Sequence, residues 1–250
     1  SNDSGNDATG SYRLILAKTR APIVVPAGDQ GGAMTNGENH LGTIEVGDID
    51  IWSFDAQAGD TITLTMAELG TLSDFYPMVQ LRGPDGASIT LGQNDTVGRI
   101  DRTLALTGTY QVIVSSNDSG NDATGSYRLI LAKAGAFVVP SGDDGGSISS
   151  GGTVSGTIAT GDVDIWTFTA VAGQTINLNI VETAPLGAFY PLITLIGPNG
   201  AQITFGQGES SASITRLAPL SGTYTVLVSS NDSGNDAPGA YQLSLGITSP

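Results

Sequence analysis

Most of this chain consists of short runs in which apolar and polar residues alternate, separated by turn-forming residues. In the run Thr61-Ile62-Thr63-Leu64 every second side chain is apolar, which is typical of a strand with one buried face. The pattern predicts eight strands, at residues 41–46, 49–56, 61–68, 76–82, 87–92, 99–106, 109–115 and 126–132. Gly, Asp and Pro mark the breaks, as in Gly83-Pro84-Asp85-Gly86. This predicts an all-β, antiparallel, jelly-roll-like sandwich, with residues 21–26 as a ninth strand or a linker.

The same pattern returns 114 residues later in the chain. Residues 24–115 align without a gap to 138–229, with 46 of 92 positions identical, and 116–131 align to 230–245 with 12 of 16 identical. A repeat of this length is far longer than the period of about 20 to 50 residues found in solenoids, so each repeat is expected to be a domain. The sequence therefore predicts tandem sandwiches of about eight strands each, at residues 19–133 (repeat 1) and 134–250 (repeat 2).

Residues 1–18 are identical to residues 116–133, the last strand of repeat 1 and the loop before it. A lone strand cannot bury its apolar face, so something must cover it. We expect residues 1–18 to be the final strand of a preceding repeat in a longer polymer. Alternatively, they are a strand donated to a neighbouring molecule in a self-assembling filament.

Composition and charge exclude several classes of function. Of 250 residues, 24 are acidic and 9 basic, for a net charge of −15, so nucleic acid is a poor partner and cations are favoured. The chain has no cysteine, which excludes disulfides and thiolate metal sites. No apolar window is long enough to span a membrane, so membrane insertion is not expected.

The acidic residues gather in particular connections. If the strands alternate in direction, the connections at 47–50, 69–75, 93–98 and 117–125 share one end of the sandwich. Asp and Asn side chains supply the oxygen ligands that calcium prefers. The sequence therefore predicts calcium at this end of each repeat, with these candidate ligands: Asp48, Asp50, Asn117, Asp118, Asn121 and Asp122 in repeat 1, and Asp162, Asp164, Asn231, Asp232, Asn235 and Asp236 in repeat 2.

The two repeats differ in how many acids they carry. Repeat 1 has 14 acidic residues and repeat 2 has 8, and seven of those eight stand where repeat 1 also has an acid; Asp143, for example, corresponds to Asp29. The shared positions indicate that these acids were selected for where they stand in the chain, although a recent duplication would also preserve their positions. Turn formation is the competing explanation, because Asp and Asn also cap tight turns through hydrogen bonds to the backbone.

Catalysis is not expected. His40 is the only histidine, and repeat 2 has Val154 at that position, so no duplicated catalytic triad or imidazole metal site exists. No Gly-x-Ser-x-Gly motif is present. The aromatic residues occupy apolar positions of the pattern, and the best candidates for exposure are in Phe75-Tyr76-Pro77 and Phe189-Tyr190-Pro191.

A set of short motifs resembles the bacterial pre-peptidase C-terminal domain. They are Gly47-Asp48-Ile49-Asp50-Ile51-Trp52-Ser53-Phe54, Ala58-Gly59-Asp60-Thr61-Ile62-Thr63-Leu64, residues 81–86, Thr107-Gly108-Thr109-Tyr110-Gln111-Val112 and Tyr127-Arg128-Leu129. The family is a β-sandwich appended to secreted bacterial proteins and is related to the calcium-dependent collagen-binding domains of clostridial collagenases. The resemblance implies secretion, binding or adhesion, and in some members calcium. Asp29 and Glu38 are the possible counterparts of the acidic N-terminal linker that supplies metal ligands in the collagen-binding members.

These observations favour a non-catalytic, extracellular or cell-surface array of β-sandwiches, structural or adhesive in role, within a longer bacterial surface protein or fibre. Its expected partners are neighbouring copies or repeats of the same protein, and extracellular protein or polysaccharide. The alternatives are a protein- or polysaccharide-binding appendage that targets a secreted hydrolase to its substrate, and a filament subunit that donates residues 1–18.

Overall fold

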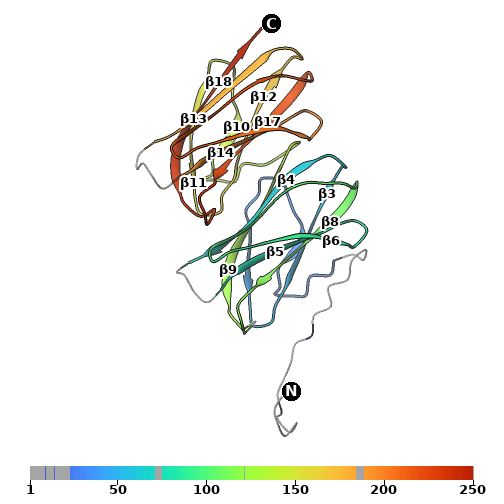
Figure 1. Cartoon of the computed structure of the whole chain (residues 1–250). Coiled ribbons are helices and arrows are strands. Elements are labelled where there is room, and N and C mark those ends of the chain that lie inside the picture. The colour runs from blue at the N-terminus through green and yellow to red at the C-terminus, as the bar shows by residue number, and fades with distance from the viewer. Residues whose placement is uncertain are drawn as a thin grey trace.

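The computed structural model describes Thr9, Leu14 and residues 23–70, 75–120, 122–183 and 189–249. These residues form strands and loops in two bodies, one for each repeat (Figure 1). The prediction of tandem all-β sandwiches is confirmed. No helix in this part of the chain is long and apolar enough to cross a membrane. Except for Thr9 and Leu14, the predicted final or donated strand at 1–18 lies outside the described residues.

Repeat 1 consists of a five-stranded and a four-stranded sheet within the described residues. The five-stranded sheet has the order β1-β3-β8-β5-β6, and the four-stranded sheet has the order β2-β9-β4-β7. Their strands are β1 (Gly31–Ala33), β2 (His40–Ile44), β3 (Asp50–Ala56), β4 (Thr61–Leu69), β5 (Pro77–Arg82), β6 (Ser88–Gln93), β7 (Val97–Thr103), β8 (Gly108–Ser116) and β9 (Gly125–Lys133).

Repeat 2 has the same topology. Its five-stranded sheet has the order β10-β12-β17-β14-β15, and its four-stranded sheet has the order β11-β18-β13-β16. The strands are β10 (Gly145–Ser147), β11 (Thr153–Ile158), β12 (Asp164–Ala170), β13 (Thr175–Glu182), β14 (Pro191–Ile196), β15 (Gln202–Gln207), β16 (Ser211–Leu217), β17 (Gly222–Ser230) and β18 (Gly239–Thr248).

The eight predicted strands of repeat 1 are all present, but the ninth strand is not where the sequence suggested. Residues 23–26 of the predicted segment 21–26 are not a strand; the ninth strand is β1, which pairs in parallel with β3. Gly31 permits this pairing, because a Cβ there would lie 2.5 Å from the carbonyl oxygen of Ile51. Its φ of +142° also lies outside the range that other residues favour.

Each repeat has its own apolar core between its two sheets. In repeat 1 the side chains of Ile62, Leu64 and Met66 on β4 are fully buried against those of Val112 and Val114 on β8, within one cluster. Repeat 2 has an equivalent cluster formed by β12, β13, β14, β17 and β18. The alternation of apolar residues along each strand therefore selects the face that lines the core.

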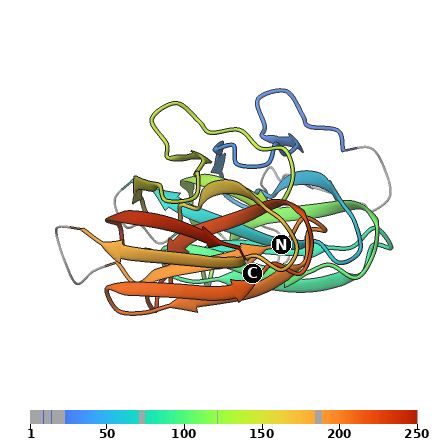
Figure 2. The ribbon, with the colours of Figure 1, turned by 90° about the horizontal axis from the view of Figure 1, so that it is seen from above.

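The two repeats are stacked sheet on sheet. The four-stranded sheet of repeat 1 lies against the five-stranded sheet of repeat 2, and β4 is consequently buried on both faces: its outward residues Thr61, Thr63 and Thr65 are no more than 4% exposed. A third apolar cluster joins the repeats across this boundary, consisting of Ala132, Val163, Ile165, Ile196 and Leu227. The segments that lead into the two repeats, blue and yellow-green in Figure 2, lie on the same side, as in a stack of repeats with one orientation.

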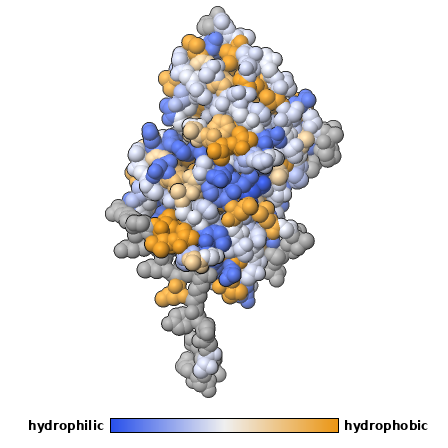
Figure 3. Space-filling view, turned by 180° about the vertical axis from the view of Figure 1, so that it is seen from behind, coloured by the Kyte–Doolittle hydropathy of each residue, from blue (hydrophilic) through white to orange (hydrophobic). Residues whose placement is uncertain are grey.

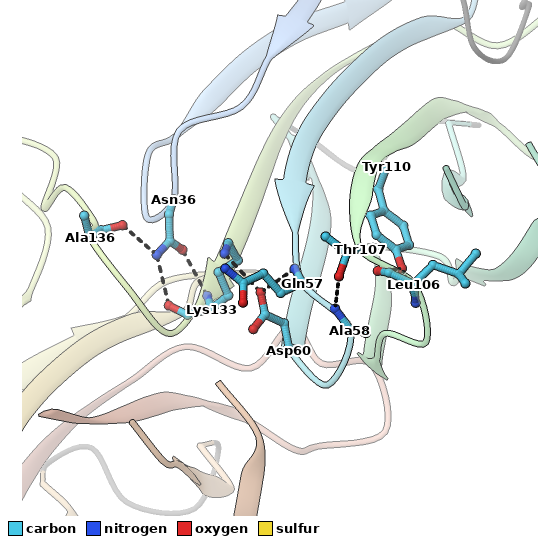
Figure 4. A network of polar contacts seen from close by, with 9 residues as sticks. All are labelled: Asn36, Gln57, Ala58, Asp60, Leu106, Thr107, Tyr110, Lys133 and Ala136. Carbon is cyan, nitrogen blue, oxygen red and sulfur yellow. Dashed lines mark hydrogen bonds and ion pairs between the residues drawn. The ribbon is translucent and has the colours of Figure 1, made fainter. Parts of the chain in front are cut away.

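Polar contacts at this boundary, which we call the junction, centre on Asn36. Its side-chain amide donates hydrogen bonds to the carbonyl oxygens of Lys133 (2.9 Å) and Ala136 (3.0 Å), and its Oδ1 accepts one from the backbone N–H of Lys133 (Figure 4). The backbone N–H of Val138 donates to the carbonyl oxygen of Asn36. Asn36 therefore fastens the chain where it leaves repeat 1 and enters repeat 2.

Further hydrogen bonds cross the junction from β4 and β7. The backbone N–H of Thr61 donates to the carbonyl oxygen of Gly200 at 2.8 Å, and its hydroxyl accepts from the backbone N–H of Gln202 at 3.0 Å. The guanidinium of Arg99 donates to the hydroxyl of Ser229 and the carbonyl oxygen of Ser230 at 3.0 and 3.2 Å. The junction is therefore an apolar contact bordered by specific hydrogen bonds, not a loose linker.

We expect Gly42→Ala and Gly156→Ala to destabilise the protein, because a Cβ at either position would lie 2.4 Å from the ring or hydroxyl of Tyr127 or Tyr241. Overpacking of this kind costs roughly 1–3 kcal/mol of unfolding free energy, measurable by urea denaturation. Gly246→Ala is the matched control, because its Cβ would meet only Asn177, at an ordinary 3.8 Å. Equal effects of all three substitutions would contradict this packing.

Candidate metal centres

Each repeat brings three carboxylates together at one edge of its five-stranded sheet. Asp29, Asp48 and Asp50 form the first triad and Asp143, Asp162 and Asp164 the second, with one oxygen of each residue within 4.8 Å of those of its two neighbours. Among the described residues these are the two groups of His, Asp or Glu side chains close enough to hold one ion together.

The chain builds the first triad from two turns and one strand. Gly47, with φ at +67°, allows the tight turn that places Asp48 before β3, and the backbone N–H of Ile49 donates to Asp48 Oδ1 at 2.9 Å. Asp50 is the first residue of β3. The parallel pairing of β1 with β3 carries Asp29, two residues before β1, to the same place.

A chain of buried hydrogen bonds fixes Asp50. Trp52 Nε1 donates to the hydroxyl of Tyr127 at 3.0 Å, and that hydroxyl donates to Asp50 Oδ2 at 2.5 Å. Asp50 is 1% exposed, and its Oδ1 has no hydrogen-bond partner. A buried carboxylate oxygen without a partner is costly, so this atom is a strong candidate for ligating a cation.

Repeat 2 reproduces this arrangement. Trp166 Nε1 donates to the hydroxyl of Tyr241 at 2.7 Å, and that hydroxyl donates to Asp164 Oδ2 at 2.5 Å. Asp164 is also 1% exposed, and its Oδ1 also lacks a hydrogen-bond partner. The arrangement has therefore persisted while about half of the aligned residues have changed.

Burial and like charge disfavour ionisation of these carboxyl groups. Burial, with the charges of Asp48 and Asp29, raises the pKa of Asp50 to about 7, against the Tyr127 hydrogen bond, which lowers it. Burial and the charge of Asp162 raise the pKa of Asp164 to about 9, again against a tyrosine hydrogen bond. A divalent cation would remove this penalty by neutralising the charge.

The donor set fits a hard divalent cation. Each of the three carboxylates of the first triad offers one oxygen to the site, and one oxygen of each already accepts a hydrogen bond, from Gln30, Ile49 and Tyr127 respectively. Calcium takes six to eight oxygen ligands at about 2.3–2.6 Å, so water and backbone carbonyls would complete the shell. A hollow of about 350 Å³ beside the first triad, lined by residues that include Asp29, Glu45 and Asp48, leaves room for an ion to enter.

The acidic loops that follow β8 and β17 have a different local structure. Asp118 Oδ2 accepts hydrogen bonds from the backbone N–H groups of Gly120 (3.1 Å) and Asp122 (2.9 Å), as in an Asx turn. Burial acts to raise the pKa of Asp118, but the hydrogen bonds from Asp122 and Ser116 outweigh it and lower the pKa. Asp232 likewise accepts from the backbone of Gly234 and Ala237.

The structure divides the predicted ligands into two sets. Asp48 and Asp50, and Asp162 and Asp164, belong to the triads, whereas the carboxylates of the later loops belong to neither triad, namely Asp118, Asp122, Asp232 and Asp236. Asn117, Asn231 and Asn235 lie in the same loops, and Asn121 lies outside the described residues. A metal role for these loops stays a prediction.

The parity argument correctly predicted that the described strand ends flanking the four connections lie at one end of repeat 1. Asp50 pairs with Val114 and Pro77 with Ser116, so the starts of β3 and β5 flank the end of β8. Leu69 pairs with Ser126, which brings the fourth connection to the same end. The predicted ligand set nevertheless left out Asp29 and Asp143, although the match between these two acids across the repeats was the available signal.

The remaining candidate side chains are mainly structural. His40 stacks edge-on to Trp52 with ring centroids 5.0 Å apart, and burial lowers its pKa. Phe75 is fully buried, whereas Tyr76 and Tyr190 are 38% and 39% exposed. Apolar residues on the face seen in Figure 3 form separate patches among polar ones, the ordinary condition of a protein surface.

The second triad lies at the junction. Asn39 of repeat 1 donates from Nδ2 to Asp143 Oδ2 at 3.4 Å. Arg128, also of repeat 1, donates a hydrogen bond to the carbonyl oxygen of Thr160. Burial and the charge of Asp143 raise the pKa of Asp162 to about 6, and the charge of Arg128 acts against them to lower it. Residues of repeat 1 therefore set part of the environment of the triad in repeat 2.

Comparison with known proteins gives fold-level similarities. No family model and no curated protein matches the sequence. A periplasmic inhibitor of g-type lysozyme from Aeromonas hydrophila is similar at 17% identity and a TM-score of 0.35, over 42% of this chain and 96% of that chain.

Two further solved structures are similar. The pre-peptidase C-terminal domain of a collagenase from Bacillus anthracis matches at 21% identity and a TM-score of 0.34, over 41% of this chain and 95% of that chain. Tandem CBM51 modules of a family 98 glycoside hydrolase from Streptococcus pneumoniae match at 7% identity and a TM-score of 0.29, over 85% and 84%. The function is therefore argued from this chain's own residues.

Without metal, we expect stability to fall as pH rises. A carboxyl group whose pKa is higher in the folded than in the unfolded protein stabilises the fold fully below about 3.8, and the contribution is lost as pH rises toward about 7 for Asp50 and about 9 for Asp164. Melting curves in chelator between pH 5 and 8 should therefore show a decreasing Tm. Asp50→Asn with Asp164→Asn should flatten that decrease, and an unchanged slope would contradict the buried environment.

Proposed function

We propose that this chain is a non-catalytic, extracellular segment of a β-sandwich array, structural or adhesive in role, that binds calcium at the triads of both repeats. The observation that carries the proposal is the duplicated buried carboxylate whose Oδ1 has no hydrogen-bond partner, at Asp50 and Asp164. A role in turn formation does not account for it, because that atom accepts no hydrogen bond from the backbone.

Calcium at these positions would link parts of the chain that are distant in sequence. In repeat 1 it would tie Asp29, and with it the segment leading into the domain, to β3. In repeat 2 it would stiffen the junction, since Asn39 contacts Asp143 there. An ion that binds only the folded state stabilises that state by mass action, by about 2.7 kcal/mol at a free concentration of about 100 times Kd.

The same residues argue against catalysis. The triads contain three carboxylates of one repeat and no histidine, and His40 has no counterpart in repeat 2. Calcium sites of extracellular modules work at about 10⁻⁴–10⁻³ M, a concentration met outside cells, and this supports an extracellular location. The formal net charge of −15 also makes nucleic acid a poor partner.

We expect calcium to raise the Tm of the whole chain at pH 7.5 relative to the protein in chelator, with about two calcium ions per chain by elemental analysis. Asp50→Asn combined with Asp164→Asn should abolish both the bound metal and the rise in Tm, since each removes a triad carboxylate. Asp95→Asn is the matched control, because Asp95 is exposed and outside the triads.

Magnesium at the same concentration should have a smaller effect, because it requires near-ideal octahedral geometry. An unchanged Tm in calcium together with no bound metal would reject the proposal. If metal still binds to the Asp50→Asn, Asp164→Asn chain, the metal site lies elsewhere, and the loops around Asp118 and Asp232 are the alternative positions.

A further inference from the structure

The stack leaves one sheet of each repeat without a neighbour among the described residues. The free sheets are the five-stranded sheet of repeat 1 and the four-stranded sheet of repeat 2. Because the repeats share one topology, the residues that form the junction have counterparts 114 positions away, on or beside a free sheet. The chain therefore allows a direct test of whether either free sheet carries the residues needed to form another junction.

The free sheet of repeat 1 keeps the apolar surface that is covered in repeat 2. At the junction Val163, Ile165 and Leu227 are 5%, 3% and 2% exposed. Their counterparts are again large aliphatic residues but are only half-buried, and we call these three residues the acceptor face: Ile49, Ile51 and Ile113. Large aliphatic side chains at all three positions indicate a surface that is made to be covered.

The acceptor face is bordered by the same hydrogen-bonding groups as the junction. Repeat 2 receives bonds from repeat 1 at Gly200, Ser229 and Ser230, and the counterparts in repeat 1 are identical residues: Gly86, Ser115 and Ser116. Val46 stands in place of Thr160, whose carbonyl oxygen accepts a hydrogen bond from Arg128. Arg82 also departs from the pattern, in place of the buried Ile196, and its Nε donates to Gln80 on the same strand at 3.1 Å.

The free sheet of repeat 2 lacks three of the side chains that reach across the junction. Those side chains in repeat 1, which we call the donor face, are Asn36, Arg99 and Arg128, and their counterparts are Ser150, Ser213 and Gln242. Two positive charges are thus absent at these positions, whereas Thr61 is kept as Thr175. Ser150 bonds only to the backbone of Ile247, within its own repeat, whereas Asn36 also reaches Ala136.

Small apolar residues beside the donor face also differ between the two repeats. Ala132 is fully buried in the apolar cluster of the junction, and Ala67 is fully buried in the strand that faces repeat 2. Their counterparts are Gly246, half-buried, and Val181, 43% exposed. The burial pattern of β13 alternates, as in a strand with one face in water, whereas the pattern of β4 is continuous.

Residues 1–18 match the strand that covers the equivalent face of repeat 2. Residues 1–18 carry Arg13, Ala17 and Lys18, which are identical to Arg128, Ala132 and Lys133 of β9. A repeat that ends in residues 1–18 would therefore present the same last strand to repeat 1 that repeat 1 presents to repeat 2.

We propose that the acceptor face docks a further repeat of the same kind, one that ends in residues 1–18, in the register of the junction, and that repeat 2 terminates the stack. The array then grows only on its N-terminal side. The inference rests on the array part of the proposed function and does not depend on bound calcium.

A three-repeat chain tests this proposal. Residues 19–115 are placed before Ser1, so that residues 1–18 complete the added repeat. The chain has no cysteine, so spin labels can be attached to cysteines introduced at Leu106 and Leu220, equivalent positions that are each 43% exposed, and at the Leu106 position of the added repeat. We expect two narrow distance distributions with the same mean, one for the added repeat with repeat 1 and one for repeat 1 with repeat 2.

Ile113→Asp in repeat 1 should broaden only the first distribution, and the second reports that repeat 1 is still folded and stacked. A broad first distribution without this substitution would overturn the docking proposal. Placing residues 19–133 after Pro250 tests termination: a broad distribution is expected between repeat 2 and the added repeat, and a narrow one would overturn that part.

All measurements are made in chelator and in calcium. Narrow distributions in chelator sustain the docking proposal even where calcium binding fails, and bound calcium with a broad first distribution rejects docking alone. Sedimentation of the two-repeat chain should show a monomer, because one of its free faces lacks the donor residues. Head-to-tail association of that chain would contradict termination by repeat 2.

Discussion

The buried hydrogen bond from a tyrosine hydroxyl to an aspartate joins the two sheets of each sandwich. Tyr127 on β9 and Asp50 on β3 belong to opposite sheets, so this bond crosses the core. It satisfies one carboxylate oxygen inside an apolar interior, where an unsatisfied charge is costly. The other oxygen has no hydrogen-bond partner, and the carboxylate lies close to those of Asp29 and Asp48. The packing of the core and the chemistry of the triad therefore depend on the same side chain.

The junction extends this dependence from one repeat to the next. Arg128 follows directly after Tyr127 on β9, so one side chain enters the core of repeat 1 while its neighbour reaches the carbonyl oxygen of Thr160 in repeat 2. The register of β9 thus places both, and a one-residue slip would exchange them. Sandwich, triad and stack are consequently coupled through two adjacent residues of one strand.

Much of the fold is predictable from the sequence because alternation and turns are local signals. Asp48 and Asp50 were predicted for the same reason, since they are neighbours in the chain. Asp29 reaches them through a three-residue parallel strand that leaves no periodic pattern. The outward threonines of β4, such as Thr63, have the pattern of a solvent-facing row, yet repeat 2 covers them. In the loop at Asp118 the composition suits a turn and a metal site equally, and only the geometry shows its backbone hydrogen bonds.

The double burial of β4 has a consequence for how the two repeats diverge. A threonine that contacts the next repeat is constrained on both faces of its strand, whereas a residue facing water tolerates most polar replacements. Thr63 and Thr65 of β4 correspond to Asn177 and Asn179 of β13, and Asn179 is exposed to solvent. Among the described residues the outward row of β13 has no neighbouring repeat, so its side chains are free of the constraint that acts on β4. The same sheet position thus combines a conserved inward face with an outward face that diverges according to what covers it.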